Sequence, residues 1–508
     1  MQPRVGLYGA GALTLHLAHK KDASGDSLVF LPSFLPFAPS VLFFSYAMAA
    51  AFTLKRGFAF LGTLALVSLL LTAHPRLLGL SRGPSYTRLR RTIAALPQHD
   101  LDLPFPEGRD GRYVKFSAEI NQLGWNNCLN ERLMNAHLAY VSGRAYVFDD
   151  YWWAEEHYQF PPAPRGGART PMPALLAGPV VGDSWGEANA SSSSPGPPRS
   201  ISADWWATVC PPSVRRLIST ADPVLGKPAL GRDPTGTAVL AHWQALLSTA
   251  PERCIEIVRP PPGPDVDGWP QIFDLWLWGS PRILSLWDAF AAAPVSTLFR
   301  PSDVVRGAVE ANLRAGVFSG NGRTRVSMHM GGGGGGGDDP FGRMLTMHLR
   351  RGDYIGHCPN LIEWGAGYYG WAQLPTLPDV AAGRLQNAGS REEKLDMCLP
   401  DVAGVVKRIR EVQSEFAWAL DVVYLLTNES GVFLDELVAA LRAAGWSTVV
   451  TTRDLRLTVE QRDVSMAVDM EIARRAAAFI GNPWSSFTSN VIHQRLVAGH
   501  DPNSIRHS

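Results

Sequence analysis

Cysteine is scarce in this 508-residue chain, which contains five of them. They lie far apart, form no CxxC pair and join no cluster of histidines, which argues against a zinc module. Two disulfides with one free thiol would suit a secretory compartment, and five buried thiols would suit the cytosol equally well. The five are Cys128, Cys210, Cys254, Cys358 and Cys398.

An excess of charge of one sign is also absent, because 47 Lys and Arg stand against 46 Asp and Glu, a formal net charge of +1. This balance argues against nucleic acid or an acidic polymer as the partner. Charged residues make up 18% of the chain and hydrophobic residues 46%, which is typical of a folded protein. The length is enough for two or three domains of about 100–200 residues each.

Charge is missing altogether from two N-terminal stretches, residues 27–54 and 57–73. Three prolines interrupt the first stretch, whereas the second, GFAFLGTLALVSLLLTA, is just long enough to cross a bilayer. We therefore expect residues 1–76 to form a membrane anchor region, with one span and a lumenal body in the endoplasmic reticulum or Golgi. Basic residues flank the span on both sides, so their distribution hardly discriminates between the two orientations. The alternatives are a two-span hairpin with a cytosolic body and an N-terminal segment that is buried in the protein.

Proline, glycine and serine divide the rest of the chain. Residues 77–110 have the composition of a stem, residues 160–202 that of a flexible insertion, and residues 331–337 are an unbroken run of glycine. These segments predict an N-terminal α/β domain over residues 111–330, a glycine-rich linker over 331–340, and a C-terminal domain over 341–508.

Apolar strands alternate with amphipathic helices in the C-terminal domain, and the first domain has one such helix and strand, at 128–142 and 145–148. This alternation predicts parallel sheets with helices on both faces. A ligand would then bind in a cleft between the two α/β domains, at the carboxyl ends of the strands. The predicted C-terminal strands are 344–349, 421–427, 447–451 and 477–480, and the predicted helices are 402–418, 433–444, 464–476 and 485–496.

Three polar motifs lie where that cleft would be. The first is NQLGWNN, residues 121–127, in which Gly124 permits a tight turn before a helix. Asn126 and Asn127 then stand at the start of the helix, where amide groups suit an anion. The alternative is an ordinary helix cap formed by Asn126.

The second motif is HLRRGDY, residues 348–354, at the end of a predicted strand. His348 and Arg350 project from the same face of that strand, because side chains alternate with a period of two. A guanidinium at the carboxyl end of a strand is suited to a two-pronged contact with phosphate. The alternative is a buried histidine beside a surface ion pair of Arg351 with Asp353.

The third motif is AAFIGNPWSSFTSN, residues 477–490, in which a strand ends and a helix opens with hydroxyl side chains. Backbone N–H groups and the hydroxyls of Ser485, Ser486 and Thr488 would form a neutral cradle for a diphosphate. Ordinary capping by Ser and Thr is the alternative.

Together, HLRRGD and FIGN-x-x-SSFT, with Asp469 ahead of the latter, closely resemble the protein O-fucosyltransferases and the wider GDP-fucose-dependent group. GWNN is similar to a variant of that group's N-terminal motif. The resemblance implies a GT-B-like fold, in which two Rossmann-like α/β domains face a cleft. It implies an inverting, metal-independent transfer of fucose from GDP-fucose to a hydroxyl of a protein or glycan acceptor, with no cofactor besides the donor substrate.

The resemblance also implies a role for each matching residue. Arg350 would neutralise the charge that develops on the β-phosphate, and His348 would contact the diphosphate or the sugar. GDP is a good leaving group, so stabilisation of the departing oxyanion is the main demand. The donor-binding residues would be Ser485, Ser486 and Thr488 at the phosphates, Phe487 beside the nucleotide, Asp469 at the guanine edge, and Gly124, Asn126 and Asn127 from the other domain.

One position departs from the family pattern. Some members carry a Glu before the glycine of the N-terminal motif, acting as the base, and here that position is Leu123. Glu119 and Glu131 are nearby, but neither matches the motif. Either no dedicated base exists, or the base comes from elsewhere in the chain. Two alternatives to a fucosyltransferase are a transferase that uses another nucleotide sugar and a non-catalytic relative that keeps the fold and binds one. Two sequons, at Asn189 and Asn428, permit glycosylation if the body is lumenal.

Overall fold

The computed structural model describes residues 83–508 apart from 161–163, 165–166, 187–195, 262–268, 320–338, 384–388 and 417–419. The predicted membrane anchor, the glycine run and the Asn189 sequon lie outside the described residues. In the part of the chain that is described, no helix combines the length and the apolar character needed to cross a bilayer.

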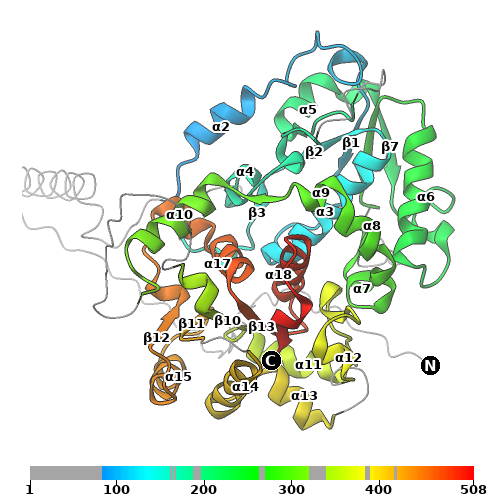
Figure 1. Cartoon of the computed structure of the whole chain (residues 1–508). Coiled ribbons are helices and arrows are strands. Elements are labelled where there is room, and N and C mark those ends of the chain that lie inside the picture. The colour runs from blue at the N-terminus through cyan, green and yellow to red at the C-terminus, as the bar shows by residue number, and fades with distance from the viewer. Residues whose placement is uncertain are drawn as a thin grey trace, which may run out of the picture. The chain divides into compact units, whose positions relative to one another are not determined.

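Two five-stranded sheets, both wholly parallel, form the framework of residues 83–508 (Figure 1). The prediction of α/β architecture with parallel sheets is confirmed. The first sheet has the order β6-β2-β1-β8-β7, with β1 Tyr113–Phe116, β2 Ala145–Phe148, β6 Ile201–Ser202, β7 Arg215–Ser219 and β8 Cys254–Val258. The second has the order β12-β11-β10-β13-β14, with β10 Met344–Leu349, β11 Val422–Thr427, β12 Thr448–Thr451, β13 Ala478–Gly481 and β14 Ile505–His507.

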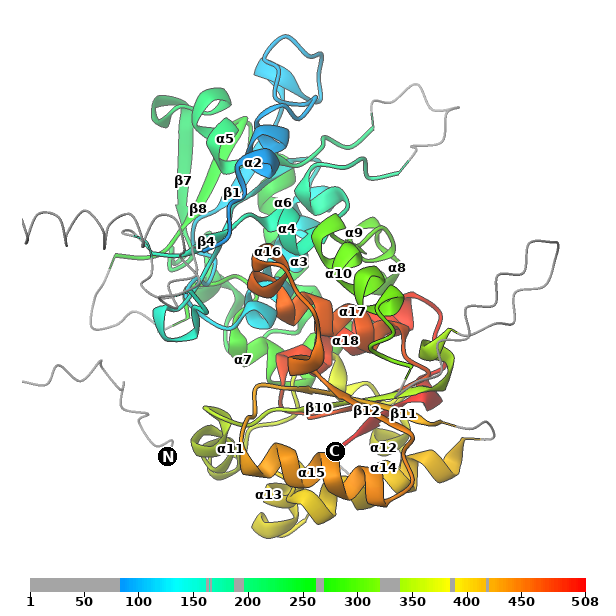
Figure 2. The ribbon, with the colours of Figure 1, turned by 90° about the vertical axis from the view of Figure 1, so that its left-hand side faces the viewer.

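The second sheet is covered on both faces, as its apolar strands require. Every residue of β10 and β11 is buried. Leu345, Met347 and Leu349 pack in one core with the helices below the sheet, α14 Val402–Glu415 and α15 Val432–Ala443 (Figure 2). The alternate residues, among them His348, face the helices above it, α17 Ser465–Arg475 and α18 Ser486–Val497. The period of two that the sequence predicted for this strand is therefore confirmed.

The remaining elements surround these sheets. Two short antiparallel pairs, β3 Tyr151–Trp152 with β4 Arg169–Thr170 and β5 Leu176–Ala177 with β9 Arg300–Pro301, lie outside them. The helices of the first half are α2 Thr87–Ala94, α3 Trp125–Val141, α4 Met172–Leu175, α5 Ala203–Val209, α6 Gly236–Thr249, α7 Leu275–Trp278, α8 Trp287–Ala292, α9 Pro294–Thr297 and α10 Asp303–Arg314. Those of the second half not yet given are α11 Tyr354–Glu363, α12 Pro378–Ala381, α13 Arg391–Cys398 and α16 Val459–Asp463.

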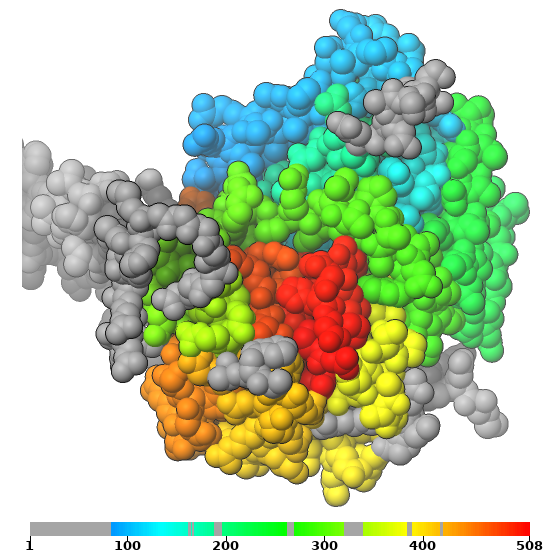
Figure 3. Space-filling view, viewed as in Figure 1, coloured from blue at the N-terminus to red at the C-terminus, as the bar shows by residue number. Residues whose placement is uncertain are grey.

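Helices from the two halves of the sequence pack directly against each other. α10 packs on α17, and α18 packs on α3, α8 and α9. In the space-filling view the red C-terminal residues lie between green residues of the first half and yellow residues of the second (Figure 3). The imidazole of His493 lies 2.8 Å from the hydroxyl of Ser296 across this contact. The predicted domain limit at 330 lies outside the described residues and the limit at 340 lies just after the undescribed range 320–338, and both stay predictions.

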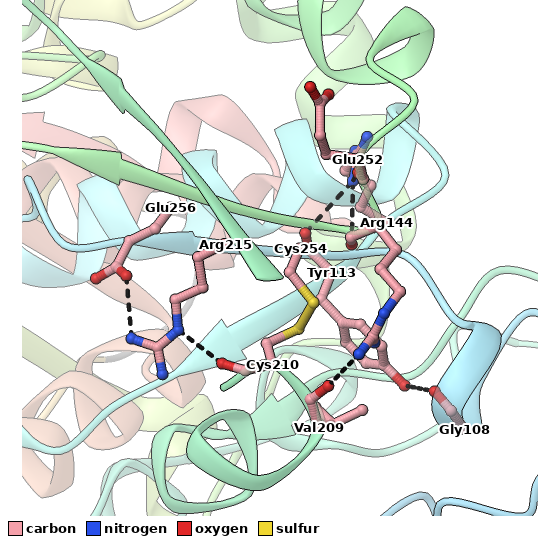
Figure 4. The surroundings of a disulfide bond; sticks show 10 residues. Gly108, Tyr113, Arg144, Val209, Cys210, Arg215, Glu252, Cys254 and Glu256 are labelled. Atoms are coloured by element: carbon pink, nitrogen blue, oxygen red, sulfur yellow. Dashed lines mark hydrogen bonds and ion pairs between the residues drawn. A yellow bond between two sulfur atoms is a disulfide. The ribbon is translucent and has the colours of Figure 1, made fainter. Parts of the chain in front are cut away.

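Four of the five cysteines form disulfides, Cys210–Cys254 and Cys358–Cys398, and Cys128 is buried and free. This is the first of the two alternatives that the sequence left open. The first disulfide joins the end of α5 to β8 of the first sheet, and the guanidinium of Arg215 donates to the Cys210 carbonyl beside it (Figure 4). The second disulfide joins α11 to α13, in the segment between β10 and α14.

Candidate functional site

The second and third motifs meet at one edge of the second sheet. β10 and β13 are parallel neighbours, with Thr346 opposite Phe479. Because parallel strands end at the same edge, the residues that follow both strands are brought together. The Nδ1 atom of His348 lies 3.2 Å from Oγ1 of Thr488, and the rings of His348 and Phe487 are 4.5 Å apart. Two motifs 140 positions apart in the chain therefore form one site.

Gly481 lets the start of α18 approach the end of β13. A Cβ atom at this position would lie 2.3 Å from Cγ2 of Thr488, a distance at which only glycine fits. Ser485 then caps α18, because its hydroxyl accepts the Phe487 N–H at 3.3 Å. The capping alternative is thus present, and of the three residues only Ser486 is half-buried rather than buried. Thr488 is fully buried, and its hydroxyl contacts His348.

His348 is a neutral side chain in this environment. Its ring is buried between the strand and α18. Burial, with a smaller contribution from the Arg350 cation, lowers the pKa of His348 to about 3. An imidazole of this kind acts by hydrogen bonding and packing, and it does not supply positive charge to a bound anion.

Arg350 is a charged residue of the second motif that is partly open to solvent. Its side chain is 37% exposed, and Nη2 donates to Oδ2 of Asp353 at 2.8 Å. Arg351 instead forms an ion pair with Glu429, at 3.0 Å, and its guanidinium lies 3.7 Å from the centre of the Phe433 ring. The alternative ion pair of Arg351 with Asp353 is therefore wrong. The two arginines separate because consecutive residues of an extended chain project to opposite sides.

The first motif reaches the same region from the other half of the chain. α3 begins at Trp125 with Gly124 as its N-cap, so capping by Asn126 is wrong because the N-cap lies two residues earlier. The carbonyl oxygen and Oδ1 of Asn126 accept hydrogen bonds from Nδ2 of Asn490 in α18, at 3.0 and 3.2 Å. Asn127 is half-buried in the first turn of α3. All three motifs thus contact or flank α18.

Asp469 is engaged by the protein itself. The Tyr424 hydroxyl donates to its Oδ1 at 2.5 Å, and the Thr452 hydroxyl donates to its Oδ2 at 2.9 Å. Burial raises the pKa of Asp469 to about 7, against the lowering effect of those two hydrogen bonds. A guanine that binds this carboxylate would have to displace the hydroxyl of Tyr424 or that of Thr452. The assignment of Asp469 to the guanine edge therefore stays a prediction.

The carboxylates near the first motif lie beneath it and support it. Glu119 accepts hydrogen bonds from the Tyr146 hydroxyl at 2.8 Å and from the Asn135 amide at 3.1 Å. Glu131 accepts the backbone N–H of Ile120 at 2.8 Å. Burial raises the pKa of Glu119, and burial together with the Glu119 charge raises that of Glu131. Both are buried: Glu131 holds the loop before α3 through Ile120, whereas Glu119 joins β2 to α3.

Asn482 lies in the turn before α18, and its sequence context alone predicted no role for it. Its side chain is buried, its Oδ1 accepts the Trp484 N–H at 3.0 Å, and its Nδ2 donates to the Cys398 carbonyl at 2.8 Å. It therefore joins the turn before α18 to the disulfide-linked segment. The asparagine of FIGN was the available signal, since Asn commonly bonds to its own backbone in turns.

A further cavity lies on the face of the second sheet opposite α18 (Figure 2). It has a volume of about 1040 Å³ and lies between α14 and α15, with Arg351, Val406, Arg410 and Phe433 in its lining. In the described ranges, His, Cys, Asp and Glu side chains form no group of three or more that could hold a metal ion.

Comparison with known proteins gives structural likeness at low identity. No family model matches the sequence, and no curated protein matches it significantly. Solved structures that align include POFUT1 in complex with GDP-fucose, at 14% identity and a TM-score of 0.46, covering 78% of this chain and 97% of that chain. Fucosyltransferase NodZ from Bradyrhizobium aligns at 12% identity and a TM-score of 0.34, covering 76% of this chain and 92% of that chain. At such values, the function proposed below depends on this chain's own residues.

Proposed function

We propose that this protein is a glycosyltransferase of GT-B-like fold that transfers fucose from GDP-fucose to a hydroxyl of a protein or glycan acceptor. The observation that carries the proposal is the junction of the three motifs at α18. His348 contacts Thr488, and Asn126 contacts Asn490, so residues from both halves of the chain surround one helix start.

The start of α18 is suited to the diphosphate. A 12-residue helix carries a partial positive charge at this end, where the Ser485 hydroxyl accepts the Phe487 N–H and the Ser486 side chain follows in the first turn. Arg350 follows the neighbouring strand with its guanidinium partly in solvent. In the proposed complex the β-phosphate replaces Asp353 as the partner of the Arg350 guanidinium.

The chemistry then depends on stabilising the leaving group. The acceptor oxygen forms a bond to the anomeric carbon as the bond from that carbon to the β-phosphate oxygen breaks, and the acceptor proton is released. Negative charge grows on GDP as the bond breaks, where Arg350 and the helix start attract it without a metal ion. Leu123 offers no carboxylate for the acceptor proton, and its carbonyl accepts the Tyr151 hydroxyl at 2.9 Å.

A transferase with another nucleotide sugar is the second candidate. It is favoured by Asp469, whose two oxygens already accept hydrogen bonds from Tyr424 and Thr452. If these bonds persist in the complex, Asp469 does not select guanine, and the base is recognised elsewhere.

Nucleotide binding distinguishes the two candidates. Thermal unfolding with GDP, UDP and ADP should show selective stabilisation by GDP, about 2.7 kcal/mol at a concentration of about 100 Kd. Selective stabilisation by UDP or ADP would favour the second candidate, and absence of any response would contradict both. Radiolabelled GDP-fucose with pools of peptides and glycans then tests transfer and identifies the acceptor.

We also propose that the body lies in the lumen of the endoplasmic reticulum or Golgi, anchored by residues 57–73. The two disulfides support this location, because disulfides persist in oxidising compartments. Thiol labelling of freshly isolated microsomes should leave four cysteines unreactive until a reductant is added. Reaction of all four after denaturation without a reductant would contradict the proposal.

A further inference from the structure

Asn428 follows strand β11, and its side chain holds the turn that carries Arg350. Nδ2 donates to the carbonyl oxygen of Arg351 at 3.0 Å and to Oδ1 of Asp353 at 3.1 Å. Oδ1 accepts the backbone N–H of Arg351 at 3.0 Å. One amide side chain therefore makes three hydrogen bonds to a turn 75 to 77 positions away in the chain.

The turn is shaped to receive this amide. Gly352 has a φ of +62°, in the left-handed region that side chains disfavour. A Cβ atom on Gly352 would also lie 2.8 Å from Nδ2 of Asn428. Glycine is thus required at this position both by the backbone conformation and by the approach of Asn428.

The side chain of Asn428 is connected to that of Arg350 through Asp353. One oxygen of Asp353 accepts from Asn428, and the other accepts from Nη2 of Arg350 at 2.8 Å. Arg351, between them, is fixed separately by Glu429 and by the Pro400 carbonyl, at 3.0 and 3.1 Å. Without Asn428, Asp353 loses its second partner, and the direction of the Arg350 guanidinium is no longer determined.

We propose that Asn428 is a positioning residue for Arg350, and that glycosylation of the Asn428-Glu429-Ser430 sequon is incompatible with the assembled turn. An amide nitrogen carries two hydrogens, and both are used here, one for Arg351 and one for Asp353. Glycosylation replaces one N–H bond with a bond from nitrogen to sugar carbon, so one of the two hydrogen bonds must be lost. The inference rests on the proposed function for the role of Arg350, but the contact itself can be tested without it.

The test compares two variants expressed through a secretory pathway. Asn428→Ala removes all three hydrogen bonds and the sequon, whereas Ser430→Ala removes only the sequon. We expect GDP affinity to fall about tenfold in Asn428→Ala, the change that about 1.4 kcal/mol produces, with GMP affinity unchanged because GMP lacks the β-phosphate. Ser430→Ala should bind both nucleotides as the wild type does. Asn428→Asp is the second variant if Asn428→Ala does not fold. The same loss of GDP affinity is expected, because an aspartate carboxylate cannot donate a hydrogen bond to Arg351 or Asp353.

Two further measurements make the outcomes distinct. Hydrogen exchange of the Arg351 amide should be faster in Asn428→Ala than in Ser430→Ala, whether or not GDP binds. Mass spectrometry should find Asn428 unglycosylated in the fraction retained by GDP-agarose. An unchanged ratio of GDP to GMP affinity in Asn428→Ala, or a glycan on Asn428 in the retained fraction, would overturn the positioning role. If the wild type binds no GDP but the exchange difference is found, the contact stands and the proposed function fails.

Discussion

Replacing Arg350 with alanine should abolish sugar transfer while leaving the fold intact. The stability effect is small because Arg350 is 37% exposed and Asp353 is 45% exposed. Ion pairs this open contribute about 0–1 kcal/mol. The guanidinium also lies 5.8 Å from the centre of the Tyr354 ring, a distance at which the attraction is weak. We therefore expect the free energy of unfolding to change by about 1 kcal/mol or less.

The effect on GDP binding should be much larger. A guanidinium that contacts two phosphate oxygens makes two charge-assisted hydrogen bonds, each of about 1.5–3 kcal/mol. Loss of about 3 kcal/mol corresponds to roughly a hundredfold weaker affinity. Arg350→Lys should bind GDP more tightly than Arg350→Ala but more weakly than the wild type, because an ammonium cannot make the two-pronged contact. Titration calorimetry with GDP and GMP measures the difference directly.

Arg351 provides the matched control, since it is the neighbouring arginine of the same motif. Its ion pair with Glu429 and its contact with Phe433 are structural, so Arg351→Ala should lower stability more than Arg350→Ala does. It should leave the preference for GDP over GMP unchanged. Normal transfer by Arg350→Ala, or selective loss of GDP binding in Arg351→Ala, would refute the assignment of the two arginines.

Three other predictions concern the metal, the packing of the site and its titration. Transfer should persist in excess EDTA, and a loss that Mg²⁺ or Mn²⁺ restores would contradict leaving-group stabilisation by Arg350 alone. Gly481→Ala should destabilise the protein by about 1–3 kcal/mol in urea denaturation, because its Cβ atom would clash with Thr488. The folded-state pKa of Asp469 is raised from 3.8 to about 7, so folding favours the protonated form. Wild-type stability should therefore fall relative to Asp469→Asn as the pH rises from about 4 to about 7, and parallel pH profiles of the two proteins would contradict the raised pKa.

Strands in both sheets could be predicted from the sequence alone. The strands predicted at 145–148 and 344–349 are found with those bounds, because short apolar runs between turn residues leave little choice of register. Helix ends were less certain. α3 begins at Trp125 rather than at 128, since the first-turn N–H groups of a helix need no partner within it and polar residues such as Asn126 and Asn127 are accommodated there.

Which side chains lie together depends on the tertiary structure. The sequence identified both arginines of HLRRGD, but their partners, Asp353 and Glu429, are chosen by the strand's direction and by β11 beside it. It presented Asn428 as a sequon, and the fold makes that amide part of a turn. Contacts between residues 75 or more positions apart follow no local period, because they arise from the order of strands in a sheet, which the sequence does not display.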